Sequence, residues 1–481
     1  MEFYKTCGFH PKFKINLVRM KKVQLKAREL KKAGIGNADA SLINKILQKH
    51  YPGLRKPEAL ELLRELTAFP SLREQHPLLS EVLFPAAKKA PERPQKLREE
   101  PVPYTIFGKE YIDPKAIQQM ELAVRLPVAV SGALMPDAHA GYGLPIGGVL
   151  ATENAVIPFG VGMDIGCRVC LSVFAIPPEK LSEAQDYFKK ILIRNTFFGD
   201  DYFKGHKEHP VMDREEFREI PLLKKMKDKA YEQLGTSGHG NHFVDIGIVE
   251  VPDPSQLPVP PGLYVGILSH SGSRNLGAEI ARYYTRIARE KCGLTGEAGN
   301  LSWLDLRSAE GQEYWKAMTL AGDYAAANHE LIHRRIAEEL GEPWILRIEN
   351  HHNFAWKEKD PVSGREVIIH RKGATPAAKN DTGVIPGTMI APGYLVRGRG
   401  NPLSLHSSSH GAGRRISRTQ ARSQITKKEL YEMLQQHGVE LIGGDTDEAP
   451  MAYKDIGEVM SLQAELVDIL AIFRPKIVRM C

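Results

Sequence analysis

The sequence predicts an α+β fold preceded by a short helical section. Between residues 13 and 84, apolar residues recur at three- and four-residue spacing in SLINKILQKHY and PEALELLRELTAF, which is typical of amphipathic helices. Beyond residue 103, short apolar runs alternate irregularly with helical stretches, with no fixed repeat length and no regular βαβ order. We predict strands at GGVLAT, CLSVFAI, YVGILSH, EVIIHR and GYLVRG, and helices at LSEAQDYFKKILIRN and ELIHRRIAEEL.

The composition is that of a globular chain. Of 481 residues, 42% are hydrophobic and 26% are charged, which excludes a disordered or fibrous protein. No uncharged apolar run of about 18 residues is present, and the start, MEFYKTCGFHPKFKINL, lacks the apolar stretch of a signal peptide. We therefore expect a cytoplasmic protein with no membrane partner. Its five cysteines, an odd number, are predicted to be reduced thiols: Cys7, Cys167, Cys170, Cys292 and Cys481.

Charge is distributed unevenly along the chain. Residues 1–100 hold 21 Lys and Arg against 11 Asp and Glu, whereas the remainder holds 44 against 47. Residues 85–103, PAAKKAPERPQKLREEPVP, contain five prolines and many charges, which is typical of a linker. We predict a basic helical extension over residues 1–84, a linker over 85–103 and an α+β domain over 104–481. The extension either binds a polyanion such as RNA or is simply a well-solvated helical section.

The glycine-rich segment from Met135 to Phe174 contains the first candidate ligands. Asp164 and Cys167 offer a carboxylate and a thiolate three residues apart, around a glycine turn. This combination suits a transition metal such as Mn, Fe, Co or Zn better than Mg or Ca. Cys170 completes a CxxC pattern with Cys167, but no second CxxC follows, so we expect Cys170 to pack in the core.

Further candidate ligands come from loops at the ends of strand-like runs. GTSGHGNHFVDIG supplies Asn241 and His242, HSGSRNLG supplies His270, and ENHHNFAW supplies His351 and His352. Loop histidines of this kind can converge on one pocket and bind metal through a neutral ring nitrogen. Together with Asp164 and Cys167 they could fill two metal sites if the thiolate bridges, an arrangement suited to phosphoryl transfer. Each histidine taken singly could equally be a hydrogen-bonded loop residue.

The segment LHSSSHGAGRRISRTQARS combines an accessible histidine with arginines. Small residues surround His410, and Arg414, Arg415, Arg418 and Arg422 follow at roughly helical spacing. Guanidinium groups suit bidentate binding of phosphate, and an imidazole nitrogen can attack phosphorus to form a phosphoramidate. The alternative is a basic surface helix behind a capping loop.

A competing motif lies in ANHELIHRRI. His329, Glu330 and His333 match HExxH, in which two histidines on one helix face bind zinc and the glutamate activates water. This motif would make the protein a zinc metalloprotease. No GxxH follows at the metzincin spacing, and the alternative is a charged helix face.

Six separated blocks, in this order, resemble the RtcB family of GTP-dependent RNA ligases: PDAHAGYGLPIGG, VGMDIGC, GNHF, HSGSRNLG, HRKGAT and HGAGR. The resemblance covers most of residues 104–481. It implies a single catalytic domain with mixed sheets and flanking helices. It also implies an enzyme that joins RNA ends carrying a 2′,3′-cyclic phosphate or 3′-phosphate to 5′-hydroxyl ends, in tRNA splicing or RNA repair, in some cases with an activating partner protein.

The same resemblance implies roles for individual residues. The family binds two manganese ions and GTP, and His410 takes the place of the histidine that becomes guanylylated. The implied metal ligands are Asp164, Cys167, His242, His270 and His352, with the cysteine shared. The implied nucleotide-binding residues are Asn241, His242, Phe243, Val244, Asp245, His352, Asn353, Pro386, Gly387, Thr388, Met389, His410, Gly411, Ala412, Gly413 and Tyr453.

The chain departs from the family in the nucleotide pocket. Asp245 stands where the family usually has Glu, and the chain ends in RPKIVRMC in place of the family's terminal Lys-Gly pair. Arg479 and Lys476 are candidate substitutes for that lysine. An alternative function is therefore a catalytically altered protein that binds RNA ends without joining them.

Overall fold

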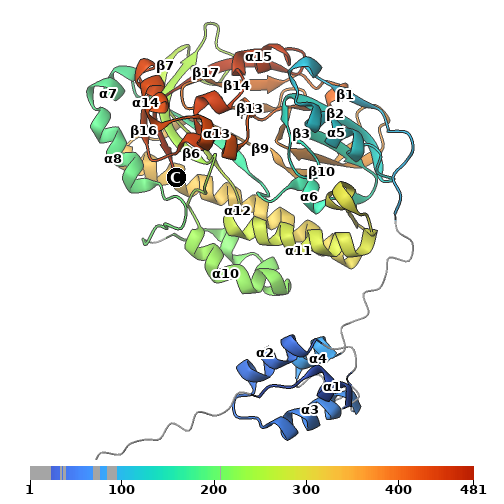
Figure 1. The fold of residues 1–481 in the computed structure, drawn as a ribbon. Coiled ribbons are helices and arrows are strands. Elements are labelled where there is room, and N and C mark those ends of the chain that lie inside the picture. The colour runs from blue at the N-terminus through green and yellow to red at the C-terminus, as the bar shows by residue number, and fades with distance from the viewer. Residues whose placement is uncertain (1–22, 33–34, 36–38, 69–75, 84–94, 206) are drawn as a thin grey trace, which may run out of the picture. The chain divides into compact units, whose positions relative to one another are not determined.

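The computed structural model describes residues 23–32, 35, 39–68, 76–83, 95–205 and 207–481, and the chain divides into two compact units, Met1–Lys89 and Ala90–Cys481 (Figure 1). Predictions for residues 1–22, including Cys7, and for the first part of the linker lie outside the described residues. From Gln95 onward, the predicted linker is hydrogen-bonded to the larger unit: Gln95 N donates to Cys292 O and Arg98 N to Arg125 O. The proposed domain limits remain predictions.

The smaller unit is helical where it is described. Its helices surround a core that contains Ile43, Leu47, Leu63 and Leu79, all with no exposed surface. The second helix begins where Asp39 accepts a hydrogen bond from Ser41 N at 2.8 Å, an ordinary N-cap. The helices are α1 (Ala27–Lys32), α2 (Ala40–His50), α3 (Lys56–Ala68) and α4 (Pro77–Leu83).

The larger unit contains two main sheets and flanking helices, which confirms the α+β prediction. All five predicted strands are present, because each is an apolar run long enough to be buried on both sides. One sheet has the order β1-β2-β3-β11-β10: β1 (Tyr104–Ile106), β2 (Ala129–His139), β3 (Ile146–Thr152), β11 (Glu366–Lys372) and β10 (Asn353–Lys359). The larger sheet has the order β13-β14-β17-β6-β7-β5-β9: β13 (Thr382–Ile385), β14 (Gly393–Gly398), β17 (Val467–Met480), β6 (Phe243–Val251), β7 (Gly262–Ser271), β5 (Arg168–Phe174) and β9 (Trp344–His351).

Shorter strands complete these sheets. β16 (Glu440–Ile442) pairs in parallel with β17, β4 (Ala155–Val156) pairs with β8 (Leu304–Asp305), and β12 (Ala374–Pro376) pairs with β15 (Ser407–Ser409). The last pair matters for the site because β15 ends directly before His410.

Two long helices, α11 (Arg274–Cys292) and α12 (Ala309–Leu340), run side by side beneath the sheets (Figure 1). Their facing residues, including Ile280, Tyr284 and Tyr324, form the largest apolar core with α10. The predicted helix at residues 181–195 is interrupted at Ala184. The remaining helices are α5 (Pro114–Ala123), α6 (Pro158–Val161), α7 (Pro178–Glu183), α8 (Gln185–Asn195), α9 (Glu216–Glu219), α10 (Pro221–Gln233), α13 (Arg418–Gln424), α14 (Lys427–Gln436) and α15 (Ile456–Ser461).

None of the described helices combines the length and apolarity needed to cross a membrane. The four described cysteines, Cys167, Cys170, Cys292 and Cys481, are free thiols. Cys170 is fully buried and accepts a hydrogen bond from Arg347 Nε at 3.3 Å, so it packs in the core as predicted.

Candidate metal and nucleotide site

Strand pairing gathers the predicted metal ligands at one edge of the larger sheet. β5 runs antiparallel to both β7 and β9, so its first residue, Arg168, lies opposite Ser271 and His351 at their ends. Cys167 precedes β5, His270 is near the end of β7, and His352 follows β9. Antiparallel register therefore brings together three side chains that are far apart in the sequence.

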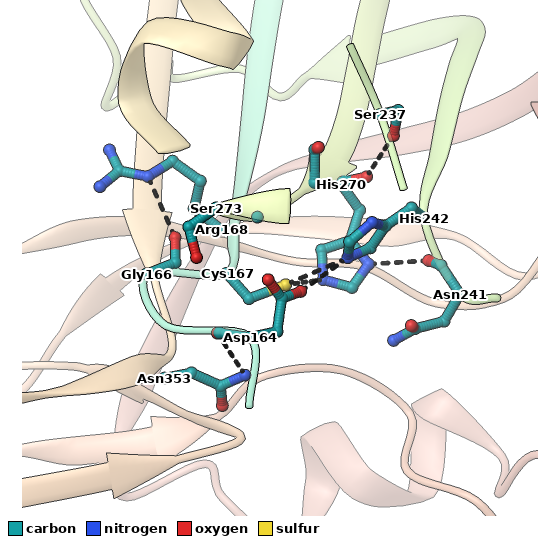
Figure 2. A network of polar contacts seen from close by, with 12 residues as sticks. Asp164, Gly166, Cys167, Arg168, Ser237, Asn241, His242, His270, Ser273 and Asn353 are labelled. Carbon is teal, nitrogen blue, oxygen red and sulfur yellow. Dashed lines mark hydrogen bonds and ion pairs between the residues drawn. The ribbon is translucent and has the colours of Figure 1, made fainter. Parts of the chain in front are cut away.

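Two groups of donor atoms share the sulfur of Cys167. Figure 2 shows this sulfur with Asp164, His242 and His270 around it. In the first, Cys167 Sγ lies 3.1 Å from His270 Nε2, which lies 3.2 Å from His352 Nε2. In the second, Cys167 Sγ lies 3.5 Å from His242 Nε2, which lies 2.8 Å from Asp164 Oδ2. The five predicted ligands are thus brought together around one sulfur atom.

Burial leaves the imidazoles of His270 and His352 neutral near pH 7. His270 Nδ1 donates to Asn241 O at 2.8 Å, which leaves its Nε2 lone pair directed at the cluster. Burial lowers the pKa of His270 to about 3, and it holds the pKa of His352 well below its ordinary value. Such rings present lone pairs instead of positive charge, which is what a metal ion requires.

The carboxylate and the thiol differ in ionisation. Burial opposes ionisation of Asp164, but His242 outweighs it through charge and hydrogen bonding and holds the carboxyl pKa below its usual range. Burial, reinforced by Asp164, raises the pKa of the Cys167 thiol well above its usual range. A bound cation reverses that effect by stabilising the thiolate.

The donor set fits a pair of transition-metal ions. One position has a sulfur and two imidazole nitrogens, and the other has the same sulfur, an imidazole nitrogen and a carboxylate oxygen. Space for the carboxylate depends on a glycine, because a Cβ at Gly272 would lie 1.9 Å from Asp164 Oδ1. The close approach of His270 and His352 nitrogens, both on neutral rings, also fits a cation between them.

His410 stands beside this cluster and is held by a buried carboxylate. Its ring centroid is 5.0 Å from that of His352. Its Nδ1 donates to Asp137 Oδ2 at 2.6 Å, and its backbone N donates to the same oxygen at 3.1 Å. Burial favours the neutral acid at Asp137, but His410 outweighs it and lowers the carboxyl pKa. Because Nδ1 carries the donated proton, the lone pair of a neutral His410 ring lies on Nε2.

Asp137 was not among the predicted site residues, although it lies in the PDAHAGYGLPIGG block. It is fully buried, and Lys454 Nζ donates to the flanking carbonyls of Pro136 and Ala138 at 2.9 and 2.8 Å. Gly413, at φ +72°, allows close approach, since a Cβ there would lie 2.1 Å from Asp137 O. In the sequence, the available signal was an aspartate within a glycine-rich motif.

A cavity of 710 Å³ connects the metal ligands, His410 and the predicted nucleotide residues. Val244 differs from the prediction, because its side chain is fully buried in the core beside Ile246. His242 lies behind the cavity surface, 7% exposed, and contacts Asp164. The predicted residues that line the cavity are Asp164, Cys167, Asn241, Phe243, Asp245, His270, His352, Asn353, Pro386, Gly387, Thr388, Met389, His410, Gly411, Ala412, Gly413 and Tyr453.

Arg479 does not reach the cavity. Its Nη1 donates to Leu192 O at 2.7 Å, and its guanidinium lies over the Phe198 ring at 5.7 Å. Val478 and Met480, which flank it on β17, line the cavity instead. Because neighbouring strand residues face opposite sides, Arg479 cannot replace the family's terminal lysine.

The arginines after His410 are partly engaged with acids. Arg414 Nη1 lies 3.1 Å from Glu448 Oε2, and Arg422 Nη2 lies 3.0 Å from Asp447 Oδ2. Arg415 is exposed and lines the cavity. Helix α13 begins at Arg418, after the Ser417 capping box, so Arg414 and Arg415 precede the helix.

The HExxH histidines form no metal site. His329 and His333 are fully buried on α12, and Ser269 Oγ lies 2.6 Å from His329 Nδ1 and 2.7 Å from His333 Nε2. Their other ring nitrogens contact Ser271 O and Ser172 Oγ. Every ring nitrogen therefore has a partner within the protein. Glu330 is on the exposed side of the helix, so the charged-face alternative holds for it but not for the histidines.

Comparisons with known proteins agree with this geometry. A family model described as "tRNA-splicing ligase RtcB" matches residues 119–220 and 203–480. The RNA-splicing ligase RtcB of Escherichia coli (strain K12) is 32% identical over 396 residues, covering 76% of this chain and 93% of that protein. The tRNA-splicing ligase RtcB of Thermococcus kodakarensis is 30% identical over 449 residues, covering 76% and 93%. The RNA-splicing ligase RtcB of Mycobacterium tuberculosis is 32% identical over 412 residues, covering 72% and 95%.

Proposed function

The chain belongs to the RtcB family, and from that premise we propose that it is an RNA ligase dependent on GTP and manganese. It joins RNA ends that carry a 2′,3′-cyclic phosphate or 3′-phosphate to 5′-hydroxyl ends, in tRNA splicing or RNA repair. The observation that carries the proposal is the double ligand cluster sharing Cys167 Sγ, with His410 beside it in one cavity.

Asp164, Cys167 and His242 would hold one manganese ion, and Cys167, His270 and His352 the other. Such a pair supplies charge neutralisation at phosphate oxygens during displacement at phosphorus. Among these residues, the sulfur and imidazoles would on affinity alone favour zinc, so the metal identity is taken from the family.

His410 supplies the nucleophile. Because Asp137 accepts a hydrogen bond from Nδ1–H, the Nε2 lone pair is free to attack the α-phosphorus of GTP, with pyrophosphate leaving. Where the RNA end is a 2′,3′-cyclic phosphate, water first opens it to a 3′-phosphate and a 2′-hydroxyl. The GMP on Nε2 then passes to an oxygen of the RNA 3′-phosphate, and His410 is restored. Attack by the 5′-hydroxyl on the activated phosphorus forms the phosphodiester and releases GMP.

The larger-sheet wall of the cavity suits a nucleobase. Phe243, Met389 and Phe473 give an apolar surface, and Asp245 sits among them with burial raising its carboxyl pKa well above the usual range. Within the described residues, Asp245 Oδ1 has no hydrogen-bond partner. A buried oxygen of this kind fits the N–H groups of a guanine edge.

The test is covalent labelling followed by joining. Incubation with Mn²⁺ and each of the four α-labelled nucleotides should give acid-labile label from GTP, and none with His410→Ala. The protein should then join a 3′-phosphate RNA to a 5′-hydroxyl RNA. End-specific RNA binding without any label would support the altered RNA-end-binding protein instead.

A further inference from the structure

The site cavity has two walls from two different sheets. The larger sheet provides Phe243, Asp245 and Met480, where the nucleotide is proposed to lie. The other wall comes from the second sheet and its loops and includes His139, Tyr142, Phe159 and Lys372. Neither the metal ligands nor the nucleotide pocket uses the aromatic residues of this second wall.

Tyr142 is the unusual residue of that wall. Its side chain is 74% exposed, although its backbone is held firmly. Gln119 Nε2 donates to Gly141 O at 2.6 Å, and Gly141 N donates back to Gln119 Oε1 at 3.0 Å. Lys372 Nζ donates to Tyr142 O at 2.5 Å. An aromatic ring presented to solvent on an anchored loop is preorganised for a flat ligand.

A second ring and a lysine adjoin it; burial lowers the pKa of that lysine, Lys372, to about 7. The Phe159 ring centroid lies 6.4 Å from that of Tyr142, and Lys372 Nζ lies 5.2 Å from the Phe159 ring. Arg415, also on the cavity surface, is exposed. Aromatic faces beside cationic groups are the combination by which proteins hold single-stranded nucleic acid.

This wall also reaches the reacting histidine. Lys372 is followed by Gly373, at which a Cβ would lie 3.2 Å from His410 Cε1. On the other side, Lys372 passes beside Gly162 in the loop that leads to Asp164. Lys372 therefore links the backbone of Tyr142 to the residues next to His410 and to the loop of Asp164.

We propose that Tyr142 and Phe159 form a stacking platform for the 3′-terminal nucleobase of the RNA strand that carries the 3′-phosphate. This inference rests on the proposed function, because GMP must pass from His410 to that phosphate. The guanine is proposed to lie on the larger-sheet wall. The RNA end that carries the 3′-phosphate would therefore approach along the other wall, which contains Tyr142.

The test places 2-aminopurine, whose fluorescence falls on stacking, at the 3′-phosphorylated end of a short RNA mixed with the full chain. Binding to the unaltered protein should quench the probe, and Tyr142→Ala should abolish the quench and weaken binding by about tenfold. Tyr142→Phe keeps the ring and should retain both. Tyr431→Ala, which removes a 53% exposed ring from α14 outside the cavity lining, is the matched control and should also retain both.

The outcomes separate this inference from the proposed function. An unquenched probe with the unaltered protein, or equal quenching by Tyr142→Ala, overturns the platform. Quenching only when the probe sits at the 5′-hydroxyl end of the partner strand also overturns it, by assigning the platform to the other RNA end. Quenching by a protein that never takes label from GTP would keep the platform and remove the ligase.

Discussion

Two sets of buried histidines lie on opposite faces of strand β7 and behave differently. Ser269 points to α12, where its hydroxyl pairs with His329 and His333. The next residue, His270, points to the cavity and meets Cys167 and His352. Since neighbouring strand residues face opposite sides, one strand separates a histidine pair held by serine hydroxyls from the histidines of the candidate metal cluster. The presence of hydroxyl partners distinguishes the two sets better than the spacing of the histidines does.

Removing one histidine from each set should affect two different properties, metal binding in one case and stability in the other. His270→Ala should lose bound manganese and reduce RNA joining by about 100-fold or more, because a direct ligand matters at least as much as its outer partners. His333→Ala should keep its manganese but lower the free energy of unfolding by about 1–3 kcal/mol, since Ser172 and Ser269 lose a partner. Metal analysis and urea unfolding measure the two effects. Equal manganese loss in both variants would contradict the distinction.

Disturbing the hydrogen bond from His410 to Asp137 should have the next largest effect, on the rate at which GTP labels His410. Asp137→Asn presents an amide to Nδ1 and favours the tautomer with its proton on Nε2, so labelling of His410 by GTP should slow by about 10²- to 10⁴-fold. Single-turnover labelling across pH measures it. Manganese content should be unchanged, because Asp137 is not among the clustered metal donors. An unaltered labelling rate would show that Asp137 does not orient the nucleophile.

The structural pair should also shape acid stability. Burial lowers the pKa of His333 to about 3, whereas an unfolded histidine titrates near 6.5. Between these values the unfolded chain binds a proton that the folded chain does not, so the free energy of unfolding falls as pH falls from about 6.5 to 3. His333→Gln should reduce that slope by up to about 1.4 kcal/mol per pH unit. Urea unfolding from pH 4 to 7 measures the slope. An identical slope in His333→Gln and in the unaltered protein would show that His333 does not contribute to this pH dependence.

The smallest effect is expected at Glu330, the glutamate that would activate water if HExxH were a zinc site. It lies on the exposed side of α12 near Arg334, so Glu330→Gln should change the free energy of unfolding by less than about 0.5 kcal/mol. RNA joining and manganese content should be unchanged. Loss of a peptidase activity in this variant alone would revive the protease alternative.

Strands were predictable where burial dictates sequence. GGVLAT, EVIIHR and GYLVRG each contain a short run of buried apolar residues and became β3, β11 and β14. The burial of the α12 histidines was not predictable, because their serine partners lie on β5 and β7, far away in the sequence. Pairing between distant segments leaves no local pattern.

The candidate site was predictable in its donors but not in its supports. Asp164 and Cys167 indicate metal chemistry by residue type, and loop position pointed to the histidines. The resemblance then selected His352 over His351. Asp137 escaped notice because its role depends on His410, 273 positions later. The direction of the Arg479 side chain, away from the cavity, likewise depends on the register of β17 against β6, in which Arg479 lies opposite Val244.

The antiparallel pairing of β5 with both β7 and β9 has a consequence for biogenesis. Cys167, His270 and His352 meet only when three strands from separate stretches of chain have come into register. Contacts of such long range form late in folding. A nascent or partly unfolded copy would therefore lack a place to capture a metal ion, and the protein would become reactive only once its architecture is finished.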